Sequence, residues 1–149
     1  MSAADQLGWD RHEILCRLEL ILEDAIRYVI GKCTGIPPTD NDFDFGEDLK
    51  LFREWLEYDP MQFEATADLA ESIIQTLTNM RNCIHHRLLA QINSGNNFQN
   101  FLTAAALMLG PSMLNYPSGL SDILVEIRAL GYPTNPLPKL PSRRFGDQS

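Results

Sequence analysis

Apolar residues recur at alternating steps of three and four through most of this chain, and that spacing limits the fold more than any other feature. Residues this far apart share one face of an α-helix. The longest stripe consists of Phe63, Ala67, Ala70, Ile74, Leu77, Ile84 and Leu88. No segment alternates apolar and polar side chains as a half-buried strand does. The sequence therefore predicts an all-α fold, a bundle of four to five helices.

Local signals predict where the first two helices begin and end. Asp10 and Glu13 resemble a capping box, so the first helix is expected to begin there and to stop at Gly31. A short second helix is expected to end at Asp59-Pro60, because proline cannot continue the hydrogen-bond ladder.

The remaining helices are predicted in the same way. The third is expected to begin at Pro60 or a few residues later and to run on to the polar break at residues 93–96. The fourth covers residues 98–109, and a fifth, capped by Ser118, ends at Gly131.

Composition narrows the class of protein. The 149 residues are 44% hydrophobic and 21% charged, which is typical of one ordinary soluble domain. The net charge of −8 argues against a surface that binds nucleic acid or anionic membranes everywhere. The N-terminal residues lack the pattern of a signal peptide, and no stretch approaches 18 apolar residues. We therefore expect a cytoplasmic protein, or a nuclear one if the host has a nucleus, with no membrane contact.

Neither a metal site nor a cofactor is predicted. The three cysteines are scattered without the spacing of zinc ligands, so they are expected to be reduced thiols: Cys16, Cys33 and Cys83. Alternate aspartates in residues 40–44 resemble the start of a calcium loop, but Phe45 stands where that loop needs glycine. We expect this segment to be a solvated acidic loop.

The C-terminal residues differ in composition from the rest. Residues 132–149 contain four prolines and carry a charge of +2, whereas residues 1–131 carry −10. The predicted organisation is therefore a helical domain, 1–131, followed by a proline-rich extended tail, 132–149. Residues 137–143 also resemble the PxxPxR ligands of SH3 domains. This segment supports one hypothesis, that the protein is a non-catalytic helical module that binds a protein partner through its tail.

A polar cluster at residues 81–86 supports a second hypothesis. Arg81 occupies a slot in the apolar stripe of its helix. Residues four apart share a face, which pairs Arg81 with His85 and Asn82 with His86, and the two faces lie about 100° apart. Arg87 follows directly. The candidate catalytic residues are Arg81, Asn82 and His86, with His85 and Arg87 as accessory residues.

This cluster lies in the one long segment that lacks carboxylates, residues 72–121. A phosphate could approach there despite the negative total charge. Arginine binds phosphate, histidine transfers protons near neutral pH, and asparagine can orient an imidazole or a hydroxyl. These groups suffice to cleave RNA without a metal, since the 2′-hydroxyl of RNA is itself the nucleophile.

The pattern Arg81-Asn82-x-x-x-His86 resembles the Arg-polar-x-x-x-His signature of the HEPN superfamily, a group of small helical domains. The resemblance implies a dimeric bundle in which the motifs of two protomers face one cleft. Many members are metal-independent ribonucleases of toxin, antiviral or RNA-processing systems, and others keep the fold without catalysis. It implies that Arg81 stabilises the scissile phosphate, His86 acts as general acid or base, and Asn82 orients them.

We therefore predict a metal-independent endoribonuclease or an RNA-binding HEPN-like domain. The implied partners are RNA, a second copy of the chain and a protein partner such as an antitoxin. A structure discriminates between the possible roles of the motif. Convergence of Arg81, Asn82 and His86 in an open groove favours a nuclease, whereas burial of Arg81 against a carboxylate such as Asp68 or Asp122 disfavours it.

Overall fold

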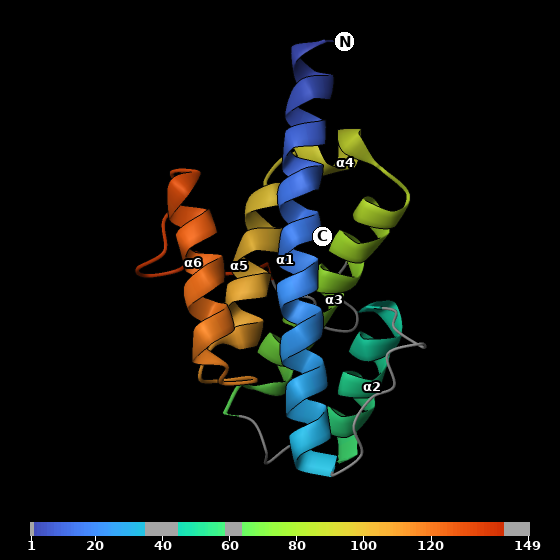
Figure 1. Ribbon diagram of the computed structural model, residues 1–149, viewed down its shortest axis with the longest axis vertical. Helices are drawn as coiled ribbons and strands as arrows, with labels where there is room; N and C mark the ends of the chain where they lie inside the picture. Colours follow the sequence, from blue (N-terminus) through green and yellow to red (C-terminus); the bar gives the residue numbers. More distant parts are fainter. Residues whose placement is uncertain (1, 35–44, 59–63, 142–149) are drawn as a thin grey trace.

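A computed structural model describes residues 2–34, 45–58 and 64–141 of the chain (Figure 1). These residues form no strand, and the all-α fold is confirmed. The helices within them are α1 (Ala3–Thr34), α2 (Phe45–Tyr58), α3 (Ala67–His85), α4 (Leu89–Asn93), α5 (Asn97–Leu109) and α6 (Pro117–Ala129). Phe63 and the predicted acidic loop at residues 40–44 lie outside the described residues.

The bundle is assembled around α1, which runs along the whole molecule and packs against each of the other five helices of the described chain (Figure 1). α3 also packs against α5, and α5 against α6. The apolar stripes of these helices meet in one core, whose largest fully buried side chains include Leu18, Phe52, Ile73, Met80 and Leu102. No described helix is long and apolar enough to cross a membrane.

α1 begins seven residues earlier than predicted, so the capping box proposed at Asp10 is wrong. Asp10 lies inside the helix, where its carboxylate accepts a hydrogen bond of 2.9 Å from the Gln6 side chain. The Ser2 hydroxyl accepts instead from the Asp5 backbone N–H at 3.1 Å. The early turns are held by α4, because Gly8 is buried directly against Leu89. Tertiary packing thus extends the helix beyond its strongest local start signal.

The predicted third helix is in fact two helices. α3 begins at Ala67, after Thr66 accepts a capping hydrogen bond from the Leu69 backbone N–H at 3.2 Å, and it ends at His85. Arg87 then adopts a left-handed backbone with φ of +51°, and the chain turns into the short α4. This turn redirects the chain so that Ile92 is buried in the core.

The last helix begins one residue before the predicted cap. Pro117 occupies the first turn of α6, where a missing N–H costs nothing, and Tyr116 rather than Ser118 is the capping residue. The end of α6 near Gly131 is as predicted.

Part of the proline-rich segment lies on the bundle. Tyr132, Leu137 and Leu140 are partly buried against the core, and the Tyr132 hydroxyl accepts a hydrogen bond of 3.4 Å from Arg11 of α1. The two leucines of the SH3-like sequence therefore contact this protein itself. Its Arg143 lies outside the described residues.

Candidate functional site

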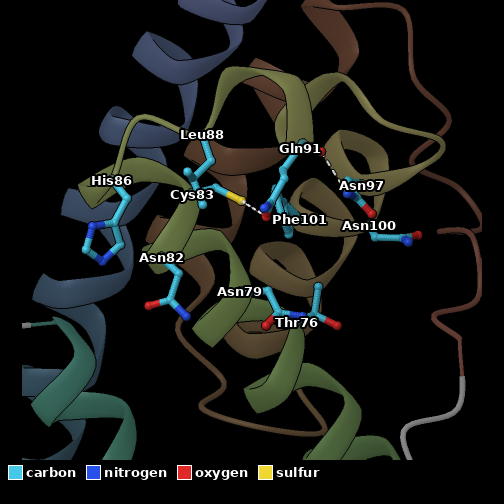
Figure 2. A pocket seen from close by; sticks show the side chains of 10 residues that line it. All are labelled: Thr76, Asn79, Asn82, Cys83, His86, Leu88, Gln91, Asn97, Asn100 and Phe101. Carbon is cyan, nitrogen blue, oxygen red and sulfur yellow. Dashed lines mark hydrogen bonds between the residues drawn. The ribbon is translucent and has the colours of Figure 1, made fainter. Parts of the chain in front are cut away.

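The polar cluster predicted from the sequence is divided between two faces of α3. Asn82 and His86 line an open pocket of about 460 Å³ formed by α3, α4, α5 and the turn between α3 and α4 (Figure 2). His85 points to α1 instead, where its Nε2 lies 3.2 Å from Oε1 of Glu19. Arg81 shares the face of His85 and does not line the pocket. The structure therefore brings Asn82 and His86 together and leaves Arg81 apart from them.

The pocket has an unusual lining that is polar but uncharged apart from the titratable imidazole. Five carboxamides, a hydroxyl, a thiol and the imidazole surround it, with two apolar side chains. No lining residue carries a carboxylate, an ammonium or a guanidinium group. The ten residues are Thr76, Asn79, Asn82, Cys83, His86, Leu88, Gln91, Asn97, Asn100 and Phe101.

The hydroxyl of Thr76 is buried and unsatisfied. Thr76 is 2% exposed, and its Oγ1 has no hydrogen-bond partner among the described residues. Thr78, on the same helix, shows the usual alternative, since its hydroxyl donates to the Ile74 carbonyl at 2.8 Å. A buried polar group without a partner costs about 1–3 kcal/mol. Thr76 therefore holds an unsatisfied hydrogen-bonding group beside the pocket.

Two of the five carboxamide side chains have no hydrogen-bond partner among the described residues. The side chains of Asn82 and Asn100 form no hydrogen bond within the part of the chain that the structure describes. The others have partial partners: Asn97 donates to the Gln91 backbone carbonyl at 2.7 Å, and Asn79 accepts from Gln75 at 3.4 Å. Each carboxamide carries both donors and an acceptor, so capacity remains at every one of them.

Cys83 is a structural member of this lining. Its thiol is 3.8 Å from Oε1 of Gln91, and the residue is 4% exposed. Burial raises the pKa of the Cys83 thiol above its usual value, which keeps the sulfur protonated and unreactive near neutral pH. We therefore assign it no nucleophilic role.

Arg81 and Arg87 occupy different environments. Arg81 is half-buried on the helical face that it shares with His85, and it makes an interaction within the chain. Arg87 is exposed at the turn directly after His86, outside the pocket lining. Of the two guanidinium groups, the one expected only as an accessory is the more accessible.

Several carboxylates lie between α1 and α2, a feature that the sequence analysis did not anticipate. Glu23 and Asp48 are both less than a tenth exposed. Burial, the charge of Glu19 with its hydrogen bond to Glu23, and the charge of Asp48 raise the pKa of Glu23 from 4.5 to about 8, while Arg27 opposes the shift. Glu23 is therefore largely protonated at neutral pH.

The sequence did hold a signal for the pocket. Thr76, Asn79, Cys83 and His86 are spaced three, four and three apart, which places them on one helical face. The apolar stripe drew attention away from this second, polar stripe. Asn97 and Asn100 join them only through the packing of α5 on α3, which local sequence does not reveal.

Comparison of the chain with protein-family models, with curated proteins and with solved structures found no match. A functional assignment therefore depends on the chemistry of the pocket and on the resemblance of residues 81–86 to the HEPN motif.

Proposed function

We propose that this protein is a HEPN-like domain that binds single-stranded RNA over the end of α3 and cleaves it without a metal ion. One observation carries the proposal: Asn82 and His86 share a pocket whose lining contains no carboxylate, although the chain has a net charge of −8. An RNA phosphate that reaches His86 is therefore not repelled by the residues around it.

His86 is the proton-transfer group of the proposed reaction. Its imidazole is exposed and accepts the proton of an RNA 2′-hydroxyl, whose oxygen then bonds to the adjacent phosphorus. The bond from phosphorus to the 5′-oxygen breaks, and that oxygen takes up a proton from the protonated His86 of a second copy of the chain. The products are a 2′,3′-cyclic phosphate and a 5′-hydroxyl. Asn82, one turn before His86, orients the imidazole or the attacking hydroxyl.

In this proposal Arg87, and not Arg81 of the motif, binds the phosphate. Arg87 is exposed next to His86 and meets the phosphate, because a guanidinium group binds phosphate oxygens in pairs. Arg81 is half-buried and already has a partner in the chain, so it stabilises the packing of α3. This assignment departs from the resemblance, in which Arg81 would bind the scissile phosphate.

A homodimer belongs to the same proposal. Asn82, His86 and Arg87 are all exposed at one end of α3, so a second copy can bring its own set to the same opening. The dimer supplies the second imidazole that the reaction requires. Sedimentation of wild type across a range of concentrations tests this part directly.

The nuclease assay uses short single-stranded RNAs labelled at the 5′ end, incubated with purified protein in chelator. We expect products ending in a cyclic phosphate from wild type, no cleavage by His86→Ala, and at least tenfold slower cleavage by Arg87→Ala. His85→Ala is the matched control, because His85 is a neighbouring histidine that faces α1. Circular dichroism establishes that each variant is folded.

Three results would overturn the proposal in part or whole. Cleavage that survives in His86→Ala removes the catalytic assignment. Binding measured by fluorescence anisotropy without any cleavage by wild type removes the nuclease activity and retains RNA binding, whereas absence of both removes the function.

A further inference from the structure

We infer that the pocket beside His86 holds one nucleobase, recognised along its polar edge by carboxamide side chains and by the buried hydroxyl of Thr76. The inference rests on the proposed function only for the source of the base, which is either a nucleotide of bound RNA or a free nucleoside. The pocket itself, about 460 Å³, falls within the roughly 300–1,000 Å³ typical of small-molecule sites.

The lining selects for a neutral, planar, hydrogen-bonding ligand. A charged group would lose its hydration without gaining a permanent countercharge, because none of the ten lining residues supplies one. A nucleobase is neutral and carries alternating donors and acceptors along its edges. Carboxamides match such edges because each presents a donor and an acceptor in one plane, and paired contacts of this kind discriminate between bases.

The arrangement of side chains fits an edge-on contact. Figure 2 shows Asn82 and His86 on one side of the pocket and Asn97 and Asn100 on the other, with Cys83 and Gln91 between them. A flat ligand between the two sides can therefore contact amides along more than one edge. His86 at the rim then stands next to the sugar and phosphate of the same nucleotide.

Thr76 is the second, independent sign of a ligand. Thr76 lines the pocket and is 2% exposed, and its hydroxyl oxygen is buried without a partner among the described residues. The neighbouring Thr78 shows that the α3 backbone can satisfy a threonine hydroxyl at 2.8 Å. The Thr76 hydroxyl is therefore available to a ligand rather than used by the fold.

The apolar part of the lining suits the faces of a base. Leu88 and Phe101 contribute the only hydrocarbon side chains among the ten, and Phe101 is itself buried. They provide van der Waals contact for an aromatic ring while the amides engage its edge. A flexible polyol such as a sugar would leave this surface unused.

The test is a titration of ¹⁵N-labelled full-length protein with each of the four ribonucleosides, and with methyl riboside as the sugar alone. We expect one or two nucleosides to shift the side-chain amide resonances of Asn79, Asn82 and Asn100, and methyl riboside to leave them unchanged. Thr76→Val keeps the side-chain shape and removes the hydroxyl. We expect it to bind that nucleoside about fivefold to tenfold more weakly than wild type does. Thr78→Val is the matched control and should bind as wild type does.

Three outcomes would overturn the inference. The first is that all nucleosides leave these resonances unchanged, and the second is that Thr76→Val binds as tightly as wild type. The third is that methyl riboside shifts the same resonances as strongly as the nucleosides, which would make the pocket a sugar site. Asn100→Ala, on the far side of the pocket from His86, provides a second variant if Thr76→Val does not fold.

The same variants separate this inference from the proposed function. If short RNAs bind and are cut equally well by wild type and Thr76→Val, the base pocket is wrong and the RNA function stands. If nucleosides bind in a Thr76-dependent way but RNA is neither bound nor cleaved, the pocket is a site for free nucleosides and the RNA function is wrong.

Discussion

Nε2 of His85 lies 3.2 Å from Oε1 of Glu19, and this contact shows which face of α3 points to α1. Arg81, one turn earlier, shares this helical face by its spacing, whereas Asn82 and His86 lie about 100° around the helix and line the pocket. Two adjacent histidines thus serve different surfaces of the molecule. The predictions below test that division and its consequences.

Arg81→Ala is expected to lower the free energy of unfolding by about 1–3 kcal/mol, because it removes a half-buried, partnered guanidinium group. His86→Ala should change it by less than about 0.5 kcal/mol, since the imidazole is exposed. Urea denaturation of both variants measures the difference. Equal stability of Arg81→Ala and wild type would contradict the structural role of Arg81.

Arg87→Gly should stabilise the protein by about 1 kcal/mol and reduce RNA cleavage at the same time. The residue adopts φ of +51°, a region in which glycine has no steric penalty and arginine does. The guanidinium group that meets the phosphate is lost in the same substitution. Asn115→Gly, at φ of +52° and away from the pocket, is the control that should affect stability alone. If Arg87→Gly is less stable than wild type, the positive φ of Arg87 is not a source of strain.

Thr76→Val should leave the ligand-free protein as stable as wild type or raise its free energy of unfolding by about 1 kcal/mol, because the hydroxyl is buried without a partner. Thr78→Val removes a hydrogen bond of 2.8 Å and should show no such gain. Chemical denaturation in the absence of nucleosides provides both values. Clear destabilisation of Thr76→Val would mean that the fold itself uses the hydroxyl.

The raised pKa of Glu23 predicts that stability falls as the pH rises. Below pH 4.5 the carboxyl is protonated in folded and unfolded chains alike, and between 4.5 and about 8 only the folded state keeps the proton. The contribution of Glu23 is therefore present at low pH and lost as the pH rises through about 8. Glu23→Gln should flatten this dependence and stabilise the protein most at pH 8 and above. The melting temperatures of wild type and Glu23→Gln, measured from pH 5 to 9, test this prediction. If the two melting temperatures change with pH in parallel, the prediction is wrong.

Gly8→Ala should destabilise the protein by about 1–3 kcal/mol even though alanine favours helices. A Cβ at this position would lie 2.9 Å from Cβ of Leu89, which cannot move without shifting α4. Because α4 carries Gln91 of the pocket, nucleoside binding should weaken as well. Thermal unfolding measures the first effect, and the same titration as above measures the second. An unchanged melting temperature would show that α4 adjusts freely.

Helices with a clear apolar stripe and a clear stop were predictable from the sequence. The predicted fourth helix, residues 98–109, corresponds to α5 at Asn97–Leu109, and α2 ends before Pro60 as expected. Local sequence signals gave the wrong helix boundaries where tertiary contacts determine them. The packing of Gly8 against Leu89 extends α1, and the left-handed turn at Arg87 divides one periodic pattern into α3 and α4.

The candidate site was predictable only in part. Asn82 and His86 were identified, and they do share a pocket. The helical spacing also separated Arg81 and His85 from Asn82 and His86, but sequence could not tell which of the two faces meets α1. Asn97 and Asn100 lie on another helix, so only the packing of α5 on α3 brings them to the pocket.

The length of α1 has a consequence for the order in which the molecule assembles. Asn93 donates to the Ala4 carbonyl at 2.9 Å, and Arg11 donates to the hydroxyl of Tyr132, 121 residues further along the chain. During synthesis the apolar stripe of α1 emerges before the helices that pack on it, and α2 and α3 cover only part of it until α4, α5 and α6 have left the ribosome. Such late closure slows folding and prolongs the exposure of sticky surface. The apolar face of α1 is therefore fully covered only after α4, α5 and α6 have been made.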